Sequence, residues 1–247
     1  LLALSAIAQK QGTLDGRAVH HERHERLRPF FEAYVNERRS SPGDDYLSEM
    51  ANGVRSDGTL PSPREVATLT VTVFGAGLET TLRTLGGMVR FLASDPELAD
   101  ALRDEPGLIP DFIEEWMRFS SSVLGTFRYA LVDCVLGGVE VPAGSTIYIA
   151  FAAANRDPEV VESPEEFLLG RDRRREHLNF GVGVHYCIGH ALARLEIRSA
   201  LECLLEQTEE IALLRPGSRA GRMPSFLLDV PMEVDLRLTA SATGAVA

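Results

Sequence analysis

One cysteine of this sequence lies where a thiol could bind a metal ion. Cys187 follows Gly181 and Gly183 and precedes Gly189 in the segment 180–194. Glycine adopts backbone conformations that are closed to other residues, so this loop can turn tightly and lie flat against a broad group. We therefore expect the loop to present its cysteine to a flat ligand.

A helix is predicted directly after this loop. Apolar residues recur at helical spacing at Ile188, Leu192 and Leu195, so the helix begins at about Cys187. The unpaired N–H groups and the positive dipole end of a helix N-terminus lower the pKa of a thiol. They favour the thiolate, which is the form that binds metal.

Two other interpretations of this segment are open. Cys187 could be a small buried hydrophobe, as single cysteines often are. His185, Cys187 and His190 could also form a zinc site. Structural zinc usually takes four ligands with paired cysteine spacing, and the chain has no C-x-x-C pair, so zinc is disfavoured.

A second candidate site lies inside a long helix that is predicted from Ser62 to about residue 92. Gly75 and Gly77 interrupt its apolar pattern, just before Glu79 and Thr80. A glycine inside a helix costs about 1 kcal/mol relative to alanine, so one expects a reason for each. Close approach of a flat ligand is one reason, and close packing of helices through small residues is the other.

The residues of the loop resemble the signature of a known family. The pattern Phe-Gly-x-Gly-x-His-x-Cys-x-Gly-x-x-Leu-Ala-Arg-x-Glu over residues 180–196 is similar to the cysteine loop of the cytochrome P-450 family, the thiolate-haem monooxygenases. The resemblance implies that Cys187 ligates the iron of haem b. It also implies further haem contacts, at Gly77, Arg128, Phe180, Gly181, His185 and Gly189.

The glycines of the long helix belong to a second resemblance. Ala-Gly-x-Glu-Thr-Thr at residues 76–81 is similar to the family's oxygen-binding helix, in which an acid–alcohol pair delivers protons. The resemblance implies that Glu79 is the acid and Thr80 the alcohol, acting as positioned proton donors. Gly77 would leave room for dioxygen.

A third motif, Glu115-x-x-Arg118, is a weak signal alone, because such pairs are common on exposed helices. Between the two motifs above it resembles the family's structural Glu-x-x-Arg pair. The third member of that set is usually a basic residue in a Pro-x-Arg-Phe segment. Residues 164–167 have Glu166 at that position, so the sequence does not identify the third member.

Short strands are predicted at 126–131, 134–141 and 146–149, because β-branched residues and turn signals replace the helical pattern there. By resemblance, Arg128 and His185 hold the haem propionates, a task that suits a charged hydrogen bond. A surface charge on a strand is the other interpretation of Arg128. The resemblance also implies a substrate pocket lined by Ala76, Val123, Leu124, Gly125 and Thr126.

A basic run stands out in this acidic chain, at Arg171, Arg173, Arg174 and Arg175. A solvated charge run is the ordinary interpretation. In the family this segment lies on the thiolate side of the haem, so we expect it to dock a ferredoxin-type electron donor by electrostatic steering. Electrons would come from NAD(P)H through that partner, since the chain has no flavin or nucleotide fingerprint.

Composition limits the class of protein. The chain has 247 residues and a net charge of -11, which disfavours nucleic acid and anionic membrane as partners. Three cysteines without framework spacing suit a reducing cytoplasm. The chain begins with Leu1 and its first methionine is Met50, so we expect it to be part of a longer protein.

Together these features predict a mainly α fold with small β-sheets, in a single domain over residues 1–247. A terminal sheet is expected from segments 211–214, 226–230 and 234–238, followed by a disordered tail at 240–247. By resemblance this is the C-terminal portion of a P-450 monooxygenase, without the N-terminal region of that fold, that hydroxylates or epoxidises a small apolar substrate. The alternative is a haem-binding or catalytically silent fragment.

Overall fold

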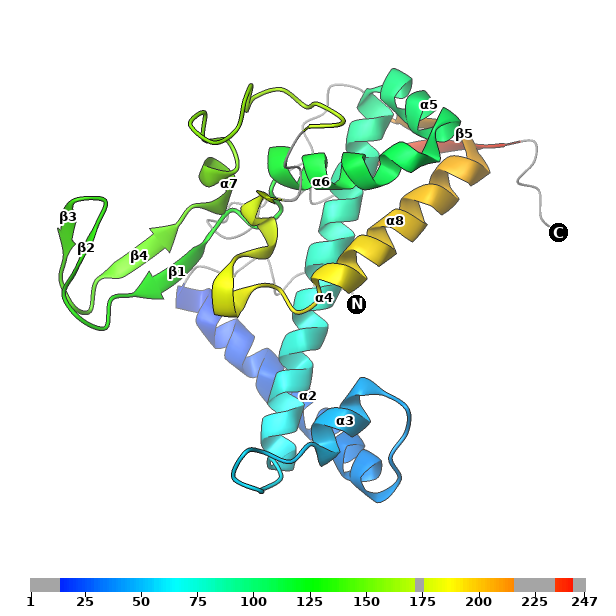
Figure 1. Ribbon diagram of the computed structural model, residues 1–247. Coiled ribbons are helices and arrows are strands. Elements are labelled where there is room, and N and C mark those ends of the chain that lie inside the picture. Colours follow the sequence, from blue (N-terminus) through cyan, green and yellow to red (C-terminus); the bar gives the residue numbers. More distant parts are fainter. Residues whose placement is uncertain (1–13, 172–175, 216–233, 242–247) are drawn as a thin grey trace. The chain divides into compact units, whose positions relative to one another are not determined.

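The computed structural model describes residues 14–171, 176–215 and 234–241 (Figure 1). Its contacts group the chain into two compact units, Leu1–Glu79 and Thr80–Ala247, and each is described by itself. The boundary falls inside helix α4, between Glu79 and Thr80. The single domain predicted from the sequence therefore stays a prediction.

The first unit is helical. It contains α2 (Leu14–Ser40), α3 (Tyr46–Asn52) and the first part of α4 (Pro63–Ser94). The predicted start of α4 is confirmed, because Ser62 and Glu65 form a reciprocal cap. The Ser62 hydroxyl accepts the Glu65 N–H at 3.3 Å, and the Glu65 carboxylate accepts the Ser62 N–H at 2.7 Å. Val35, Ala51 and Val66 form a small core.

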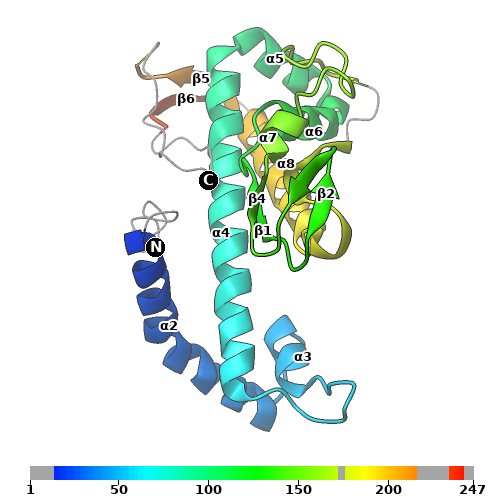
Figure 2. The same ribbon diagram turned by 90° about the vertical axis from the view of Figure 1, so that its left-hand side faces the viewer.

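The second unit contains the remaining helices and begins with the last turns of α4. Its α-helices are α5 (Pro96–Asp104), α6 (Ile109–Phe119), α7 (Phe151–Ala154) and α8 (His190–Gln207), and its short 3-10 helices are η1 (Pro106–Leu108), η3 (Leu178–Phe180) and η4 (Gly183–His185). Figure 2 shows α5 and α6 grouped at the C-terminal end of α4. The core joins α4, α6 and α8 through Met88, Leu92, Phe112, Ile197 and Leu201. This packing fixes α8, the helix that follows the cysteine loop.

The described strands form three small antiparallel pairs. They are β1 (Thr126–Tyr129) with β4 (Thr146–Ile149), β2 (Cys134–Leu136) with β3 (Val139–Val141), and β5 (Thr208–Leu213) with β6 (Leu236–Ala240). Gly137 and Gly138, with φ of 54° and 83°, make the tight turn between β2 and β3. The predicted class, mainly α with small sheets, is confirmed.

The C-terminal strand extends further than predicted. Ala240 pairs with Thr208, and the Ser241 N–H donates to the Gln207 carbonyl at 2.9 Å. Residues 240 and 241 are therefore ordered, and of the predicted tail only 242–247 is left, outside the described residues. The predicted segment 226–230 also lies outside them. No helix within the described ranges is long and apolar enough to cross a bilayer.

Candidate functional site

The segment between η3 and α8 folds into a loop that closes on itself. Gly181 and Gly183 have φ of 70° and 66°, in the left-handed region that favours glycine. The Cys187 N–H donates to the Phe180 carbonyl at 2.8 Å, and the Tyr186 N–H donates to the Gly183 carbonyl at 3.0 Å. The glycines predicted to shape the loop are therefore in the conformations that a tight loop requires.

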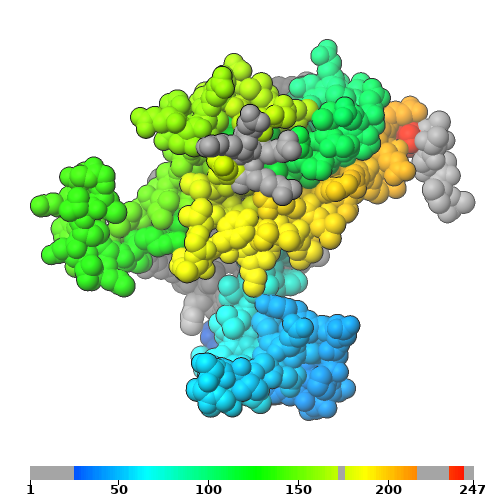
Figure 3. All heavy atoms as spheres, viewed as in Figure 1, coloured from blue at the N-terminus to red at the C-terminus, as the bar shows by residue number. Residues whose placement is uncertain are grey.

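Cys187 is half-buried at the end of this loop, and several apolar residues close to it in the sequence are exposed. Val182, Val184 and Ile188 have exposed fractions of 62%, 97% and 80%. Figure 3 shows this segment, coloured yellow, on the face of the second unit. The prediction that the loop can present a thiol to a broad apolar group is consistent with this arrangement.

Helix α8 begins later than the sequence predicts. Its first residue is His190, because Gly189 is the N-cap residue and Tyr186 has extended backbone angles. Two residues, Ile188 and Gly189, therefore separate Cys187 from the first residue of the helix. The buried face carries Ile197, Leu201 and Leu205, whereas Leu192 and Leu195, which gave the helical spacing in the sequence, are exposed.

Aromatic rings pack beneath the loop. The Arg194 guanidinium lies 4.4 Å from the centroid of the Phe180 ring, which is a cation–π contact. The rings of Tyr186 and His190 are 4.8 Å apart, and the ring of Phe180 is 6.2 Å from that of His190. Phe180, predicted to contact haem, therefore also joins the loop to the start of α8.

Glu114 of α6 binds residues on both sides of the loop. Its carboxylate accepts Arg194 Nε at 2.5 Å and Nη2 at 2.9 Å, and lies 3.1 Å from His177 Nε2. Burial raises the pKa of this carboxyl, but the hydrogen bonds from Arg194 and His177 outweigh burial and lower it to about 2. Glu114 is therefore an ionised buried carboxylate with charged and polar donors.

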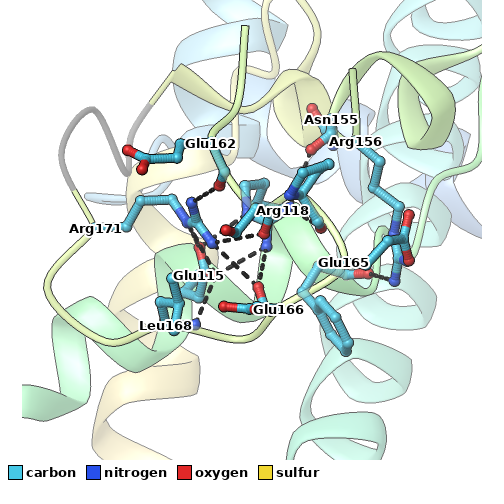
Figure 4. Close-up of polar contacts among 12 residues, drawn as sticks. Glu115, Arg118, Asn155, Arg156, Glu162, Glu165, Glu166, Leu168 and Arg171 are labelled. Carbon is cyan, nitrogen blue, oxygen red and sulfur yellow. Dashed lines mark hydrogen bonds and ion pairs between the residues drawn. The ribbon is translucent and has the colours of Figure 1, made fainter. Parts of the chain in front are cut away.

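The neighbouring Glu115 is the centre of a second buried network, drawn in Figure 4. Its carboxylate accepts Arg118 Nε at 2.9 Å and Nη2 at 2.8 Å, and the Leu168 N–H at 3.0 Å. Burial raises the pKa of Glu115, and the hydrogen bonds from Arg118 and Leu168 outweigh that effect and lower it. Glu115 and Arg118 are 1% and 4% exposed, so this is a core pair and not a surface pair.

The third member of this network is a basic residue, Arg171. Its Nε lies 3.2 Å from both oxygens of Glu115, and its side chain is 9% exposed. Arg118 and Arg171 also donate to backbone carbonyls of the loop between α7 and η3, at Asn155, Glu162, Ser163, Pro164 and Glu166 (Figure 4). The network thus uses the carbonyl of Glu166, the residue that replaces the expected base.

This placement corrects one prediction about the electron donor. Arg171 was expected to belong to a docking surface, but its guanidinium donates hydrogen bonds to Glu115 and to backbone carbonyls within the fold. A side chain held in this way cannot also meet a partner protein. Arg173, Arg174 and Arg175 lie outside the described residues, so their part of the docking prediction stays a prediction.

The acid–alcohol pair lies on α4, which is helical without interruption from Pro63 to Ser94. An added Cβ at Gly77 would meet no atom within 4 Å, which is consistent with space beside that glycine. The Thr80 carbonyl accepts the Thr84 hydroxyl at 2.8 Å, and Thr84 Oγ1 lies 2.7 Å from Ser122 Oγ. The Thr84 hydroxyl has one proton, which it donates to the Thr80 carbonyl, so the Ser122 hydroxyl is the donor in its contact with Thr84. The roles of Glu79 and Thr80 as proton donors stay predictions.

The two predicted propionate donors are available for a ligand. Among the residues that the structure describes, Arg128, half-buried on β1, donates only within its own strand, to the Phe127 carbonyl at 2.9 Å and to Thr126 Oγ1 at 3.4 Å. It forms no ion pair with any described residue. His185 is exposed at the end of η4. Whether they hold propionates stays a prediction.

The predicted pocket residues that precede β1 pack against neighbouring strands and loops. The Leu124 carbonyl accepts the Ala152 N–H at 3.0 Å. Gly125 is buried, and a Cβ there would meet the Ile149 carbonyl oxygen and lie 2.5 Å from the Tyr148 ring. Gly125 is thus required for close packing against β4. Ala76 belongs to the first unit, and the pocket formed by Ala76, Val123, Leu124, Gly125 and Thr126 stays a prediction.

No group of three or more His, Cys, Asp or Glu side chains among the described residues is placed to hold a metal ion, His185 and His190 included.

The sequence alone did not identify Glu114 and His177. The one signal in the sequence was that Glu114 is a second carboxylate directly before Glu115. Its partner Arg194 lies 80 residues away and is identified only by the structure. His177 carried no signal beyond its position before the loop.

Comparison with known proteins gives consistent matches. The model of the family "Cytochrome P450", here written cytochrome P-450, matches residues 11–209. Cytochrome P-450 144 of Mycobacterium tuberculosis is 39% identical over 194 residues, which are 76% of this chain and 42% of that protein. The 6-deoxyerythronolide B hydroxylase of Saccharopolyspora erythraea is 34% identical over 179 residues, 72% of this chain and 44% of that enzyme.

A solved structure agrees in fold. The substrate-free cytochrome P-450 CYP150A6 of Mycobacterium marinum superposes with a TM-score of 0.84 and 35% identity, covering 92% of this chain and 56% of that one. The chain spans less than half the length of the two curated relatives named above.

Proposed function

Because this chain belongs to the cytochrome P-450 family, we propose that it is the haem-binding portion of a monooxygenase of the bacterial type. The reaction proposed is insertion of one oxygen atom of O2 into a C–H or C=C bond of a small apolar substrate, with the other atom leaving as water. The observation that carries the proposal is the self-closed loop that presents Cys187 among exposed apolar side chains.

The residues present fit a haem on chemical grounds. Val182, Val184 and Ile188 offer apolar surface around a half-buried thiol, as the face of a porphyrin requires. Arg128 has no carboxylate partner among the described residues, so its charge suits a propionate. When bound, haem would supply O2 binding and reduction, with the cysteine thiolate donating electron density that favours O–O cleavage.

The chain's own residues would supply the ligand, the anchors and the protons. Cys187 would bind as the thiolate, and Arg128 and His185 would orient the cofactor by hydrogen bonds to its carboxylates. The Glu79 carboxyl would hold a proton, and the Thr80 hydroxyl would pass it on, since positioned acids of this kind accelerate proton transfer. Electrons would come from NAD(P)H through a ferredoxin-type donor, in the cytoplasm.

The second candidate is a haem-binding or catalytically silent fragment. It is favoured by one observation, that the chain spans 42% and 44% of the length of its relatives. Both candidates contain the cysteine loop, so a fragment that binds haem would have the same ligand and differ only in activity, whereas a silent fragment would not hold haem through Cys187.

The carbon-monoxide difference spectrum of the reduced chain, expressed with haem available, tests the proposal. The wild type should give a thiolate-type Soret band that Cys187→Ala abolishes. Cys203→Ala, at an exposed cysteine of α8, is the matched control and should keep the band. A thiolate-type band that survives in Cys187→Ala would refute the assignment of Cys187 as the iron ligand. The absence of this band in the wild type would favour the silent fragment.

A further inference from the structure

The cysteine loop has few ties of its own to the rest of the second unit. The backbone hydrogen bonds described for residues 180–189 close within the segment 178–193, as in the Gly181 to Leu178, Cys187 to Phe180 and His190 to Cys187 bonds, and the last of them joins the Gly189 carbonyl to the first turn of α8. A loop that bonds mainly to itself can shift as a body unless its two ends are held. The ends are therefore the places to look for what fixes it.

One carboxylate holds both ends. Glu114 accepts two bonds from Arg194, which lies after the loop, and faces His177, which lies before it. The Asn179 N–H donates to His177 Nδ1 at 3.2 Å, so the proton of this imidazole is on Nε2 and is donated to Glu114.

Arg194 connects the same carboxylate to the loop itself. Its Nη1 donates to His190 Nδ1 at 3.1 Å, and its guanidinium covers the Phe180 ring. Glu114 is 4% exposed, and the side chain of His177 is 1% exposed, so solvent does not compete for these bonds. Bonds between a buried carboxylate and a two-pronged guanidinium are strong and directional.

We propose that Glu114 is a positioning residue, which through His177 and Arg194 fixes the loop that presents Cys187. The effect on iron ligation rests on the proposed function, whereas the fixing of the loop rests on the contacts of this chain alone. Glu114 touches neither the sulfur nor a substrate, so it acts only through these two residues. A carboxylate that merely stabilised the fold would not affect the loop more than its surroundings.

Amide hydrogen exchange of the haem-free chain tests the proposal directly. In Glu114→Gln, exchange over residues 178–189 should rise by about tenfold or more, as expected from the loss of a charged hydrogen bond. Exchange in the second half of α8 and in β5 should stay at the wild-type rate. Glu202→Gln, which breaks the exposed pair of Arg198 and Glu202 on α8, is the matched control.

A second variant guards against unfolding. Glu114→Gln leaves the partly buried Arg194 guanidinium without its counter-charge, which can itself destabilise the protein. Glu114→Gln/Arg194→Met removes both charges and keeps the apolar bulk, and its loop should still exchange about tenfold faster. Wild-type exchange of the loop in this folded double variant would overturn the proposal, as would a uniform rise over the whole unit.

The haem-loaded chain gives an independent result. At equal haem content, the ratio of thiolate-type to non-thiolate carbon-monoxide band should fall in Glu114→Gln and in His177→Phe, and should recover in His177→Gln, which can still donate. An unchanged ratio would overturn the role in ligation. If the wild type gives no thiolate band, the proposed function fails, while the exchange experiment still decides whether Glu114 fixes the loop.

Discussion

Replacing Arg171 by glutamine should destabilise the second unit, because its guanidinium is a buried part of the Glu115 network. The variant loses two contacts of 3.2 Å to the carboxylate and the bonds to the carbonyls of Ser163 and Glu166, at 3.3 and 3.1 Å. A docking residue would instead be exposed, and its loss would leave stability unchanged. The substitution therefore separates the two interpretations of this arginine.

The size of the effect follows from what remains. Removing one partner of a buried ion pair costs about 3–5 kcal/mol, and a charged hydrogen bond contributes about 1.5–3 kcal/mol. Glu115 keeps both bonds from Arg118 and the bond from Leu168, so its charge stays compensated. We therefore expect a loss of about 2–3 kcal/mol, which is less than the cost of an uncompensated buried charge and within the range of a charged hydrogen bond.

Urea unfolding followed by tryptophan fluorescence measures this loss. Trp116 is the one tryptophan of the chain and is buried on α6 beside Glu115, so its signal reports on this unit. The midpoint should fall by about 1 M, and the shift should persist at high salt because buried charges are poorly screened. Arg198→Gln, in an exposed pair, is the control, and an equal shift in both variants would refute the reasoning.

Three further predictions concern single sites. The pKa of Glu114 lies at about 2 in the folded protein against an ordinary 4.5, so its contribution of about 3 kcal/mol is complete above pH 4.5 and is lost toward pH 2. The difference in unfolding free energy between wild type and Glu114→Gln should narrow over that interval, and a constant difference would contradict this. Gly125→Ala should reduce the free energy of unfolding by about 1–3 kcal/mol and so lower the urea midpoint, because its Cβ overlaps Ile149 and Tyr148. An unchanged midpoint would exclude that overlap. Gly77→Ala should raise stability by up to about 1 kcal/mol, since its Cβ meets no atom within 4 Å, and a lower melting temperature would count against it.

Features set by neighbouring residues could be predicted from the sequence. The start of α4 at Ser62 was predicted, and Ser62 and Glu65 form the cap there. A cap of the same local kind begins α5, where Asp95 accepts the Leu98 N–H at 3.1 Å. Strand β4 has the predicted bounds, 146–149. Each of these signals is complete within a few residues of chain, so no tertiary contact was needed to read it.

Features set by distant partners could not be predicted. Arg171 lies 56 residues from Glu115 and belongs to a charge run that resembles a solvated surface. On α8 the helical period was found, but Leu192 and Leu195 are exposed while Ile197 and Leu201 are buried. Periodicity identifies the faces of a helix, and only the packing of α4 and α6 determines which face is inside.

The use of backbone carbonyls by Arg118 and Arg171 has a consequence for how this region can vary in evolution. The five carbonyls they bind, between Asn155 and Glu166, are present whatever side chains those residues carry. Replacements at the exposed positions among them, Glu162 and Glu166, should therefore be tolerated, which explains why an acidic residue can occupy position 166. Insertions and deletions should be rejected, because a change of one residue in length would move the carbonyls away from both guanidinium groups.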